Sequence, residues 1–110
     1  MTQAHHPPGI AVDALGAFVP GPRREHASAA HGPLDGLRLA VKDLIDVQGE
    51  VTGGGNPDWA ASRTPAMRHS PAVAACLAAG ATLVGKTITD ELAFSLEGEN
   101  AHHGTPLNPR

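Results

Sequence analysis

The run SPAVAACLAAGATLVGKT, from Ser70 to Thr87, decides the fold of this chain. A capping hydroxyl at Ser70 and a proline at the next position predict the start of a helix, and Gly80 predicts its end. The apolar residues that share one face of this helix are Val73, Cys76 and Leu77. The next residues, 81–84, form a short and partly β-branched apolar run, which predicts a strand. A helix followed at once by a strand is half of a parallel crossover unit.

The other half of the unit is predicted upstream, in the segment LRLAVKD. Between Leu37 and Val41, branched aliphatic and polar residues alternate, which is the pattern of a half-buried strand. Lys42 and Asp43 fall at the C-terminal end of this strand. Strand, helix and strand in this order predict an α/β protein with a parallel pair of strands, and such sheets bind ligands beyond the carboxyl ends of their strands.

The segment GATLVGKT, from Gly80 to Thr87, also fits the phosphate-loop pattern G-x-x-x-x-G-K-[ST]. A phosphate loop needs a strand that ends at the first glycine and a helix that begins at the Lys-Thr pair. Here Gly80 ends a predicted helix, and the variable positions form a predicted strand. We therefore interpret the match as a coincidence of spacing and not as a nucleotide site.

The composition indicates one small domain with a thin core. The chain has 110 residues, of which 41% are hydrophobic but only 3% are aromatic. Short chains bury a modest share of their surface, and aromatic side chains normally contribute much of the apolar area of a core. The net charge of -3 is spread without a basic stripe, which argues against a nucleic-acid partner.

No metal site, disulfide or membrane segment is predicted. His5 and His6 lie beside prolines in a loose tail, and no second ligand cluster with zinc-like spacing accompanies them. Cys76 is the single cysteine, which excludes an internal disulfide and fits a reducing compartment. The sequence shows neither a secretory signal nor an apolar stretch long enough to span a membrane. We therefore predict a cytoplasmic protein.

Two regions of the chain differ in character. Residues 1–33 are rich in Ala, Pro, Gly and His and predict an arm that packs onto another part of the protein, whereas the patterned region begins at Leu34. After the first predicted strand, the glycines at 53–55 predict a loop. Two interpretations of this loop stay open, a close approach to a ligand and a flexible connector. Trp59 is interpreted as a lid or packing anchor.

Several blocks together resemble a known family. They are AVKDLIDV and the later run AGATLVGKTITDELAFSLEGENAHHGTPLNPR. Their order and spacing, from Phe18 to Arg110, resemble the amidase signature family. The segments GGGNPDW and LAFSLEGEN look most like plant-type amidases that act on small amides such as indole-3-acetamide. The resemblance implies an α/β/α layered fold with a mixed sheet, of which this chain is an N-terminal fragment.

The resemblance also implies a mechanism. In the family, a serine attacks the carbonyl of a carboxamide, a second serine in a cis peptide relays its proton, and a lysine accepts that proton. The lysine of the VKD block corresponds to Lys42, the predicted catalytic residue. Ser95 lies in a segment that the family brings close to the bound amide, and it is read equally well as a hydroxyl bonded to nearby backbone. No metal or organic cofactor is implied, and the implied partner is a small amide substrate.

The catalytic role of Lys42 also has a physical basis. Burial at the end of a parallel strand, among apolar residues such as Val41 and Ile45, disfavours a charged amine and favours a neutral one that can accept a proton. The competing interpretation is a surface lysine paired with Asp43 or Asp46, because most lysines are solvated. With the resemblance, we predict catalysis.

The catalytic serines are expected elsewhere. In the family, the glycine- and serine-rich segment that contains them follows the N-P-R block, here residues 108–110. The serines of this chain are Ser28, Ser62, Ser70 and Ser95, and none lies in such a segment. We therefore expect residues 34–110 to be the first part of an amidase domain that supplies only Lys42 and is inactive alone. The alternatives are a non-catalytic remnant or binding module that pairs with a partner and, ranked below it, a transamidating subunit. The sequence does not indicate an oligomeric state.

Overall fold

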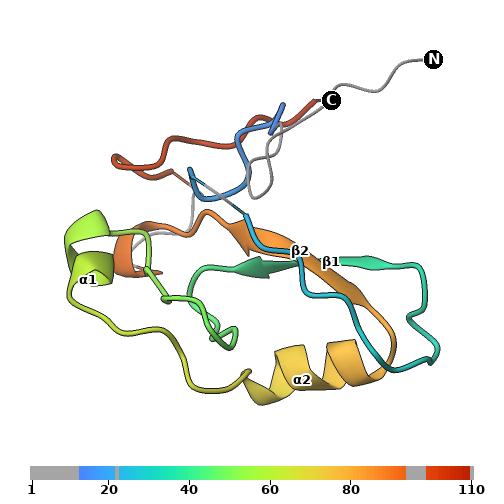
Figure 1. The fold of residues 1–110 in the computed structure, drawn as a ribbon. Coiled ribbons are helices and arrows are strands. Elements are labelled where there is room, and N and C mark those ends of the chain that lie inside the picture. Colours follow the sequence, from blue (N-terminus) through green and yellow to red (C-terminus); the bar gives the residue numbers. More distant parts are fainter. Residues whose placement is uncertain (1–12, 22, 94–98, 110) are drawn as a thin grey trace.

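The computed structural model describes residues 13–21, 23–93 and 99–109. Its elements, in chain order, are β1 (Arg38–Lys42), α1 (Pro57–Ala61), α2 (Pro71–Ala78), β2 (Thr82–Thr87) and the short 3-10 helix η1 (Glu91–Ala93). Figure 1 shows β1 and β2 side by side, with α2 lying along one face of the pair and α1 beyond one end. The strand, helix and strand predicted from the sequence are therefore all present.

The two strands pair in parallel and form a 2-stranded sheet. Leu39 pairs with Leu83 and Ala40 with Gly85, so the register shifts between these pairs and the sheet contains a bulge. β2 continues to Thr87, past the predicted end at Val84, because Gly85 and the residues after it still pair with β1. Lys86 interrupts the apolar pattern that predicted the strand, which explains the early predicted end.

Helix α2 begins and ends where the sequence predicted. The Ser70 hydroxyl accepts a hydrogen bond from the Val73 N–H at 3.4 Å, and Pro71 occupies the first turn. At the other end Gly80 has a φ of 104°, a left-handed angle that favours glycine, and its N–H donates to the Leu77 carbonyl at 3.0 Å. This turn sends the chain directly into β2, so the crossover is short.

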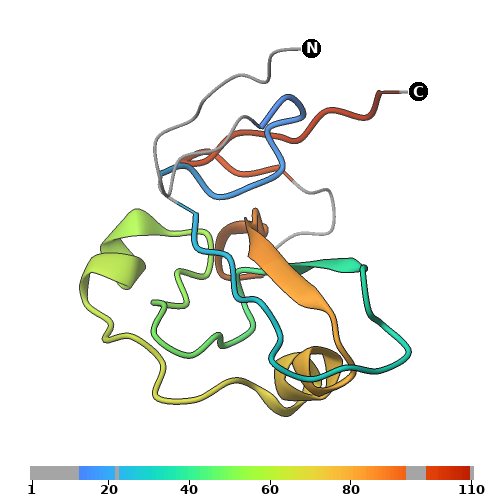
Figure 2. The ribbon, with the colours of Figure 1, turned by 45° about the vertical axis from the view of Figure 1, so that its right-hand side comes forward.

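The core is small. It consists of Val41, Val47, Val73 and Leu83, with the partly buried Leu39 and Leu77 packed against it. These residues come from both strands, from α2 and from the loop after β1, so the core lies between the sheet and α2 (Figure 2). The scarcity of aromatic residues is reflected in a core made of branched aliphatic side chains.

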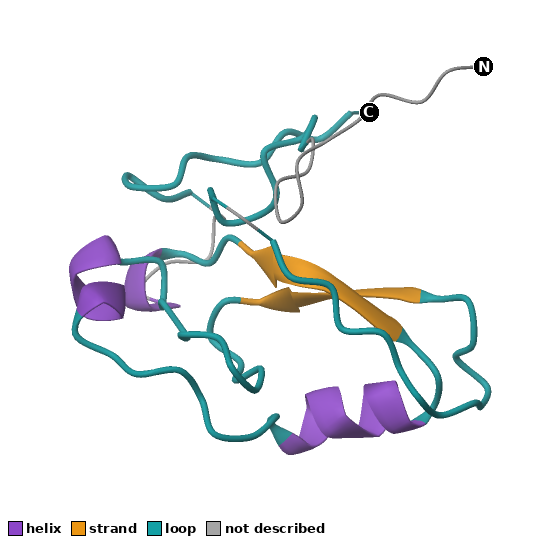
Figure 3. Ribbon diagram, in the orientation of Figure 1, coloured by secondary structure: helices purple, strands orange, loops and turns teal. Residues whose placement is uncertain are grey.

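Two described residues of the arm, Phe18 and His26, pair with the outer edge of β2. Phe18 forms an antiparallel bridge with Thr87, and His26 forms another with Leu83. Backbone hydrogen bonds accompany these bridges, among them Val19 N–H to the Lys86 carbonyl at 3.0 Å. Since the arm covers β2, β1 is the strand whose other edge has no strand partner among the described residues (Figure 3).

Helix α1 was not predicted from the sequence. Asn56 caps it, accepting a hydrogen bond from the Trp59 N–H at 3.0 Å, and Pro57 follows as its first residue. Trp59 is 42% exposed, and the guanidinium of Arg63 lies 3.7 Å from the centre of its ring. Helix α1 has only five residues, which are too few to show a helical period, so no periodicity predicts it.

Among the residues that the structure describes, no helix combines the length and the apolar character needed to cross a bilayer.

Candidate active site

The carboxyl ends of β1 and β2 meet the glycine loop, residues 53–55, at one place. The Asp43 N–H donates to the Thr87 carbonyl at 3.0 Å, which joins the two strands just beyond Lys42. The Asp43 carbonyl in turn accepts the Gly54 N–H at 2.9 Å. Ligands of open α/β sheets bind at this end of the strands. The region is therefore the candidate active site.

A buried ion pair lies under this junction. The Lys86 ammonium is 2.9 Å from Asp43 Oδ1, and these residues are only 7% and 4% exposed. The Gly53 N–H donates to the same carboxylate oxygen at 3.2 Å. Burial removes two charges from water, and only close pairing with additional hydrogen bonds offsets that penalty. Asp43 thus joins β1, β2 and the glycine loop.

The glycine loop is packed and is not a flexible connector, because all of its residues are buried. A Cβ on Gly53 would lie 2.7 Å from Asp43 Oδ2, and one on Gly55 would lie 2.7 Å from Asn100 Nδ2. Gly54 and Gly55 also have positive φ angles of 64° and 78°. Glycine is required here both for backbone angle and for close approach.

Residues after β2 hold the far side of the loop. The Asn100 amide donates to the Gly55 carbonyl at 2.8 Å and to the Thr89 carbonyl at 2.9 Å. The Leu92 N–H donates to the Gly54 carbonyl at 2.6 Å. Thr89 and the adjacent Asp90 are buried, and within the described part of the chain Thr89 Oγ1 and Asp90 Oδ1 have no hydrogen-bond partner.

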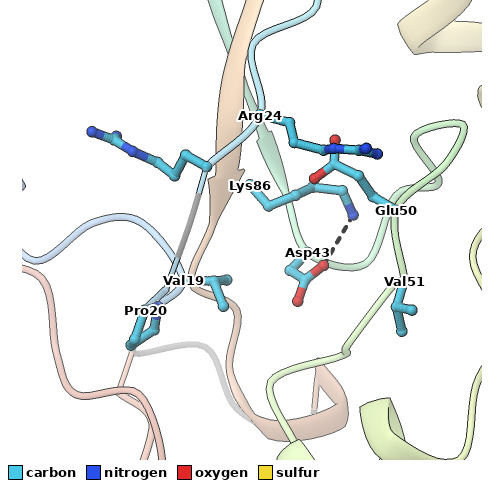
Figure 4. A pocket seen from close by; sticks show the side chains of 8 residues that line it. Val19, Pro20, Arg24, Asp43, Glu50, Val51 and Lys86 are labelled. Carbon is cyan, nitrogen blue, oxygen red and sulfur yellow. Dashed lines mark hydrogen bonds and ion pairs between the residues drawn. The ribbon is translucent and has the colours of Figure 1, made fainter. Parts of the chain in front are cut away.

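A small pocket of about 100 Å³ opens beside the ion pair. The charged residues that line it are Arg23, Arg24, Asp43, Glu50 and Lys86. Figure 4 shows the Lys86 side chain reaching toward Asp43, with Glu50 and Val51 across the pocket. Glu50 binds His26 at 2.8 Å, and Arg24 Nη1 donates to the Gly49 carbonyl at 3.3 Å. The charged side chains of Arg24, Glu50, Asp43 and Lys86 therefore each bind another group of the same chain.

Lys42 is exposed, which corrects the expectation that it would be buried. The physical reason is that β1 has no neighbour on its outer edge among the described residues, so only one side of its carboxyl end is covered. Lys42 lies at a groove of about 310 Å³ between β1 and α2, with apolar residues such as Ile45, Val73 and Cys76. This exposure agrees with the competing interpretation of Lys42 as a surface lysine. Of the carboxylates suggested as its partner, Asp43 binds Lys86, and Asp46 accepts a hydrogen bond from the Thr52 hydroxyl at 2.6 Å.

Among the described residues, no serine or histidine is shown to complete a catalytic set with Lys42. Ser95 lies outside the described residues. The Ser28 hydroxyl donates to the Leu77 carbonyl, that of Ser62 donates to the Trp59 carbonyl at 2.8 Å, and that of Ser70 caps α2. His102 binds Glu91 at 2.6 Å in the segment after β2. The described part of the chain also has no cluster of three or more His, Cys, Asp or Glu side chains that could hold a metal ion.

Sequence reasoning missed Lys86. Lys86 appeared only within the phosphate-loop match. Three of the four variable positions of that match, 82–84, lie in β2, and its lysine binds Asp43. The available signal was a lysine near the end of one predicted strand and an aspartate at the end of the other. Parallel pairing places such residues close together.

The comparisons with known proteins agree on one family. A family model described as Amidase matches residues 21–110. Amidase 1 of Oryza sativa subsp. japonica is 60% identical over 77 residues, which are 70% of this chain and 18% of that protein. Amidase 1 of Arabidopsis thaliana is 49% identical over 97 residues, 86% of this chain and 23% of that protein. The chain thus spans about a fifth of the length of these relatives.

Solved structures agree with this assignment. One, described as "An unexpected vestigial protein complex reveals the evolutionary origins of an s-triazine catabolic enzyme", superposes with a TM-score of 0.67 at 38% identity. The match covers 73% of this chain and 17% of that one.

The prediction of a cytoplasmic location is wrong. Outer envelope protein 64, chloroplastic, of Arabidopsis thaliana is 46% identical over 101 residues, 92% of this chain and 17% of that protein. The sequence features that suggested the cytoplasm therefore do not indicate it, because a protein named for an organellar envelope contains a closely similar segment.

Proposed function

The chain belongs to the amidase family, and on that premise we propose that it supplies the lysine of a site that hydrolyses small carboxamides. The lysine is Lys42, the last residue of β1. The observation that carries the proposal is its position where the carboxyl ends of both strands meet the packed glycine loop. Residues 34–110 are, in this proposal, the first part of an amidase domain.

The chemistry assigned to Lys42 is proton acceptance. A serine oxygen attacks the carbonyl carbon of the amide, and its proton passes through a second serine to the neutral lysine amine. The C–N bond then breaks, the departing nitrogen takes up a proton, and an acyl-serine ester forms. Water hydrolyses this ester to the carboxylic acid and frees the serine.

The proposal assigns both serines to a part of an amidase other than residues 1–110. Ser28, Ser62 and Ser70 each make backbone hydrogen bonds in this chain. A segment that carries the serines and packs over Lys42 would also remove water from it, and desolvation favours the neutral amine that the reaction needs. The exposure of Lys42 here is consistent with a site awaiting that segment.

A second candidate is a non-catalytic module that binds a partner through the uncovered edge of β1. An unpaired strand edge offers N–H and C=O groups to another chain. The two candidates differ in whether the gene product hydrolyses amides, and the first also requires Lys42 for that turnover.

Amide hydrolysis by the full-length product of the gene that encodes this sequence tests the proposal. Ammonia release from indole-3-acetamide and other small primary amides is measured for the wild type, for Lys42→Ala and for Arg38→Ala. Arg38 is the exposed basic residue at the other end of β1 and serves as the control. We expect Lys42→Ala to lower kcat by roughly 10³-fold or more, as for other members of a catalytic unit.

Unchanged turnover in Lys42→Ala would reject the catalytic assignment. A wild-type gene product without amidase activity would favour the binding module. Robust hydrolysis by purified residues 1–110 alone would refute the assignment of the serines to another segment.

A further inference from the structure

We propose that Asp43 is a positioning residue, whose carboxylate holds the glycine loop against the end of β1 next to Lys42. The inference rests on the proposed function of Lys42. It goes beyond that function because it assigns the task of anchoring the loop to the buried Asp43–Lys86 pair. This pair lies on the side of β1 away from the Lys42 amine.

The contacts of Asp43 converge on the loop. Its Oδ1 accepts hydrogen bonds from Lys86 Nζ at 2.9 Å and from the Gly53 N–H at 3.2 Å. Its backbone carbonyl accepts the Gly54 N–H at 2.9 Å, and its N–H donates to the Thr87 carbonyl at 3.0 Å. One residue therefore fixes two successive loop amides and the neighbouring strand.

The fit between the carboxylate and the loop is close. A Cβ on Gly53 would lie 2.7 Å from Asp43 Oδ2 and 3.6 Å from the Ala60 Cβ, so the loop backbone lies directly on the carboxylate. A side chain at this position would displace the loop. The absence of one allows the amide to reach the carboxylate oxygen.

Asp43 acts through the backbone and not by touching substrate. Successive residues of a strand point to opposite faces, and here Lys42 is exposed whereas Asp43 is 4% exposed. Because the two residues are consecutive, a shift of Asp43 also moves the peptide that carries Lys42. The contacts of Asp43 thereby fix the position of the glycine loop relative to Lys42.

Lys86 offsets the cost of burying the Asp43 carboxylate in the interior. An ionised carboxylate without a partner is strongly disfavoured in a buried site. The Lys86 ammonium supplies the opposite charge within hydrogen-bond distance. Charge neutralisation and loop anchoring are separable, because only the second needs an acceptor at position 43.

That separation defines the experiment. In the full-length gene product, Asp43→Asn/Lys86→Met is compared with Asp43→Ala/Lys86→Met. Both double variants lack the buried charges, but only the first retains a side-chain oxygen for the Gly53 N–H. Asp58→Asn, an exposed carboxylate in the first turn of α1, is the control. Cooperative thermal unfolding identifies the variants that fold.

Two quantities are measured for each variant. The first is deuterium uptake of a peptide spanning residues 48–60, which reports the loop amides whether or not the enzyme is active. We expect uptake in the Ala/Met variant to be about tenfold faster than in the Asn/Met variant, the consequence of one lost hydrogen bond. The second is the hydrolysis of a small amide, for which kcat should fall by about tenfold or more in the Ala/Met variant with little change in KM.

Equal uptake in the two double variants, or a change confined to KM, would overturn the inference. The proposed function fails separately, when Lys42→Ala keeps its turnover. Loss of turnover in Lys42→Ala with equal loop exchange in the two double variants retains the function and rejects the positioning role.

Discussion

Lys42 and Asp43 are neighbours in the chain with opposite surroundings. The side chain of the first is exposed at the edge of the sheet, and that of the second is buried in an ion pair. Strand alternation predicts their opposite directions from sequence alone. Sequence could not predict the exposure of Lys42, because that depends on which segment covers the outer edge of β1. Nor did it identify Lys86 as the partner, since that pairing depends on the strand register.

The glycine loop permits a test at single-residue resolution. Gly55 and Gly104 have similar φ angles of 78° and 88°. A Cβ on Gly55 would lie 2.8 Å from the Thr89 carbonyl oxygen, whereas no atom of the described residues lies within 4 Å of one on Gly104. Gly104→Ala should lower the free energy of unfolding by about 1–2 kcal/mol, the penalty of a left-handed backbone angle. Gly55→Ala should lower it by a further ~1–3 kcal/mol because of crowding.

Urea unfolding of the full-length gene product measures both changes. The Gly104→Ala variant controls for backbone strain, so the difference between the variants isolates the crowding. Equal destabilisation would mean that the loop can move away from Thr89 and Asn100, and that it is less rigid than its contacts indicate.

At the scale of elements, local sequence signals such as caps and glycines predicted the features that they control, namely the ends of helix α2. Ser70, Pro71 and Gly80 determine where α2 begins and ends, and these limits were read correctly. The parallel pairing of the strands also followed from the order of the elements, and the α/β class is confirmed by the likeness to solved amidase-family structures. The missed helix α1 depends on the Asn56 cap in a segment too short for periodicity.

The cap of α2 gives a prediction at this scale. Ser70→Ala removes the acceptor for the Val73 N–H and should lower the free energy of unfolding of the full-length gene product by ~1 kcal/mol. Ser70→Asp should retain most of the stability that the Ser70 cap contributes, because aspartate caps helices about as well as serine. Ser62→Ala, at an exposed hydroxyl, is the control and should change it by less than about 0.5 kcal/mol. Denaturant titration measures all three, and a neutral Ser70→Ala would show that packing alone fixes the start of α2.

At the scale of the molecule, the feature that most affects association is the uncovered edge of β1. β2 is covered by the arm, but β1 pairs only with β2 among the described residues, above a core of Val41, Val47, Val73 and Leu83. Such a core is small, and an open strand edge is a template for association. The open edge of β1 therefore offers backbone groups for pairing with a further strand, beside the position of Lys42, over which the proposed function packs the serine-bearing segment.

The behaviour of purified residues 1–110 tests this reasoning. We expect a broad, weakly cooperative thermal transition and a mass that rises with protein concentration in sedimentation experiments. A charge placed on the edge strand should oppose association, so Ala40→Lys should lower the mass at a given concentration. Ala29→Lys adds the same charge at an exposed arm position away from β1 and should leave association almost unchanged. If the chain instead unfolds cooperatively as a monomer, its core suffices without further segments. That outcome would favour the self-contained binding module.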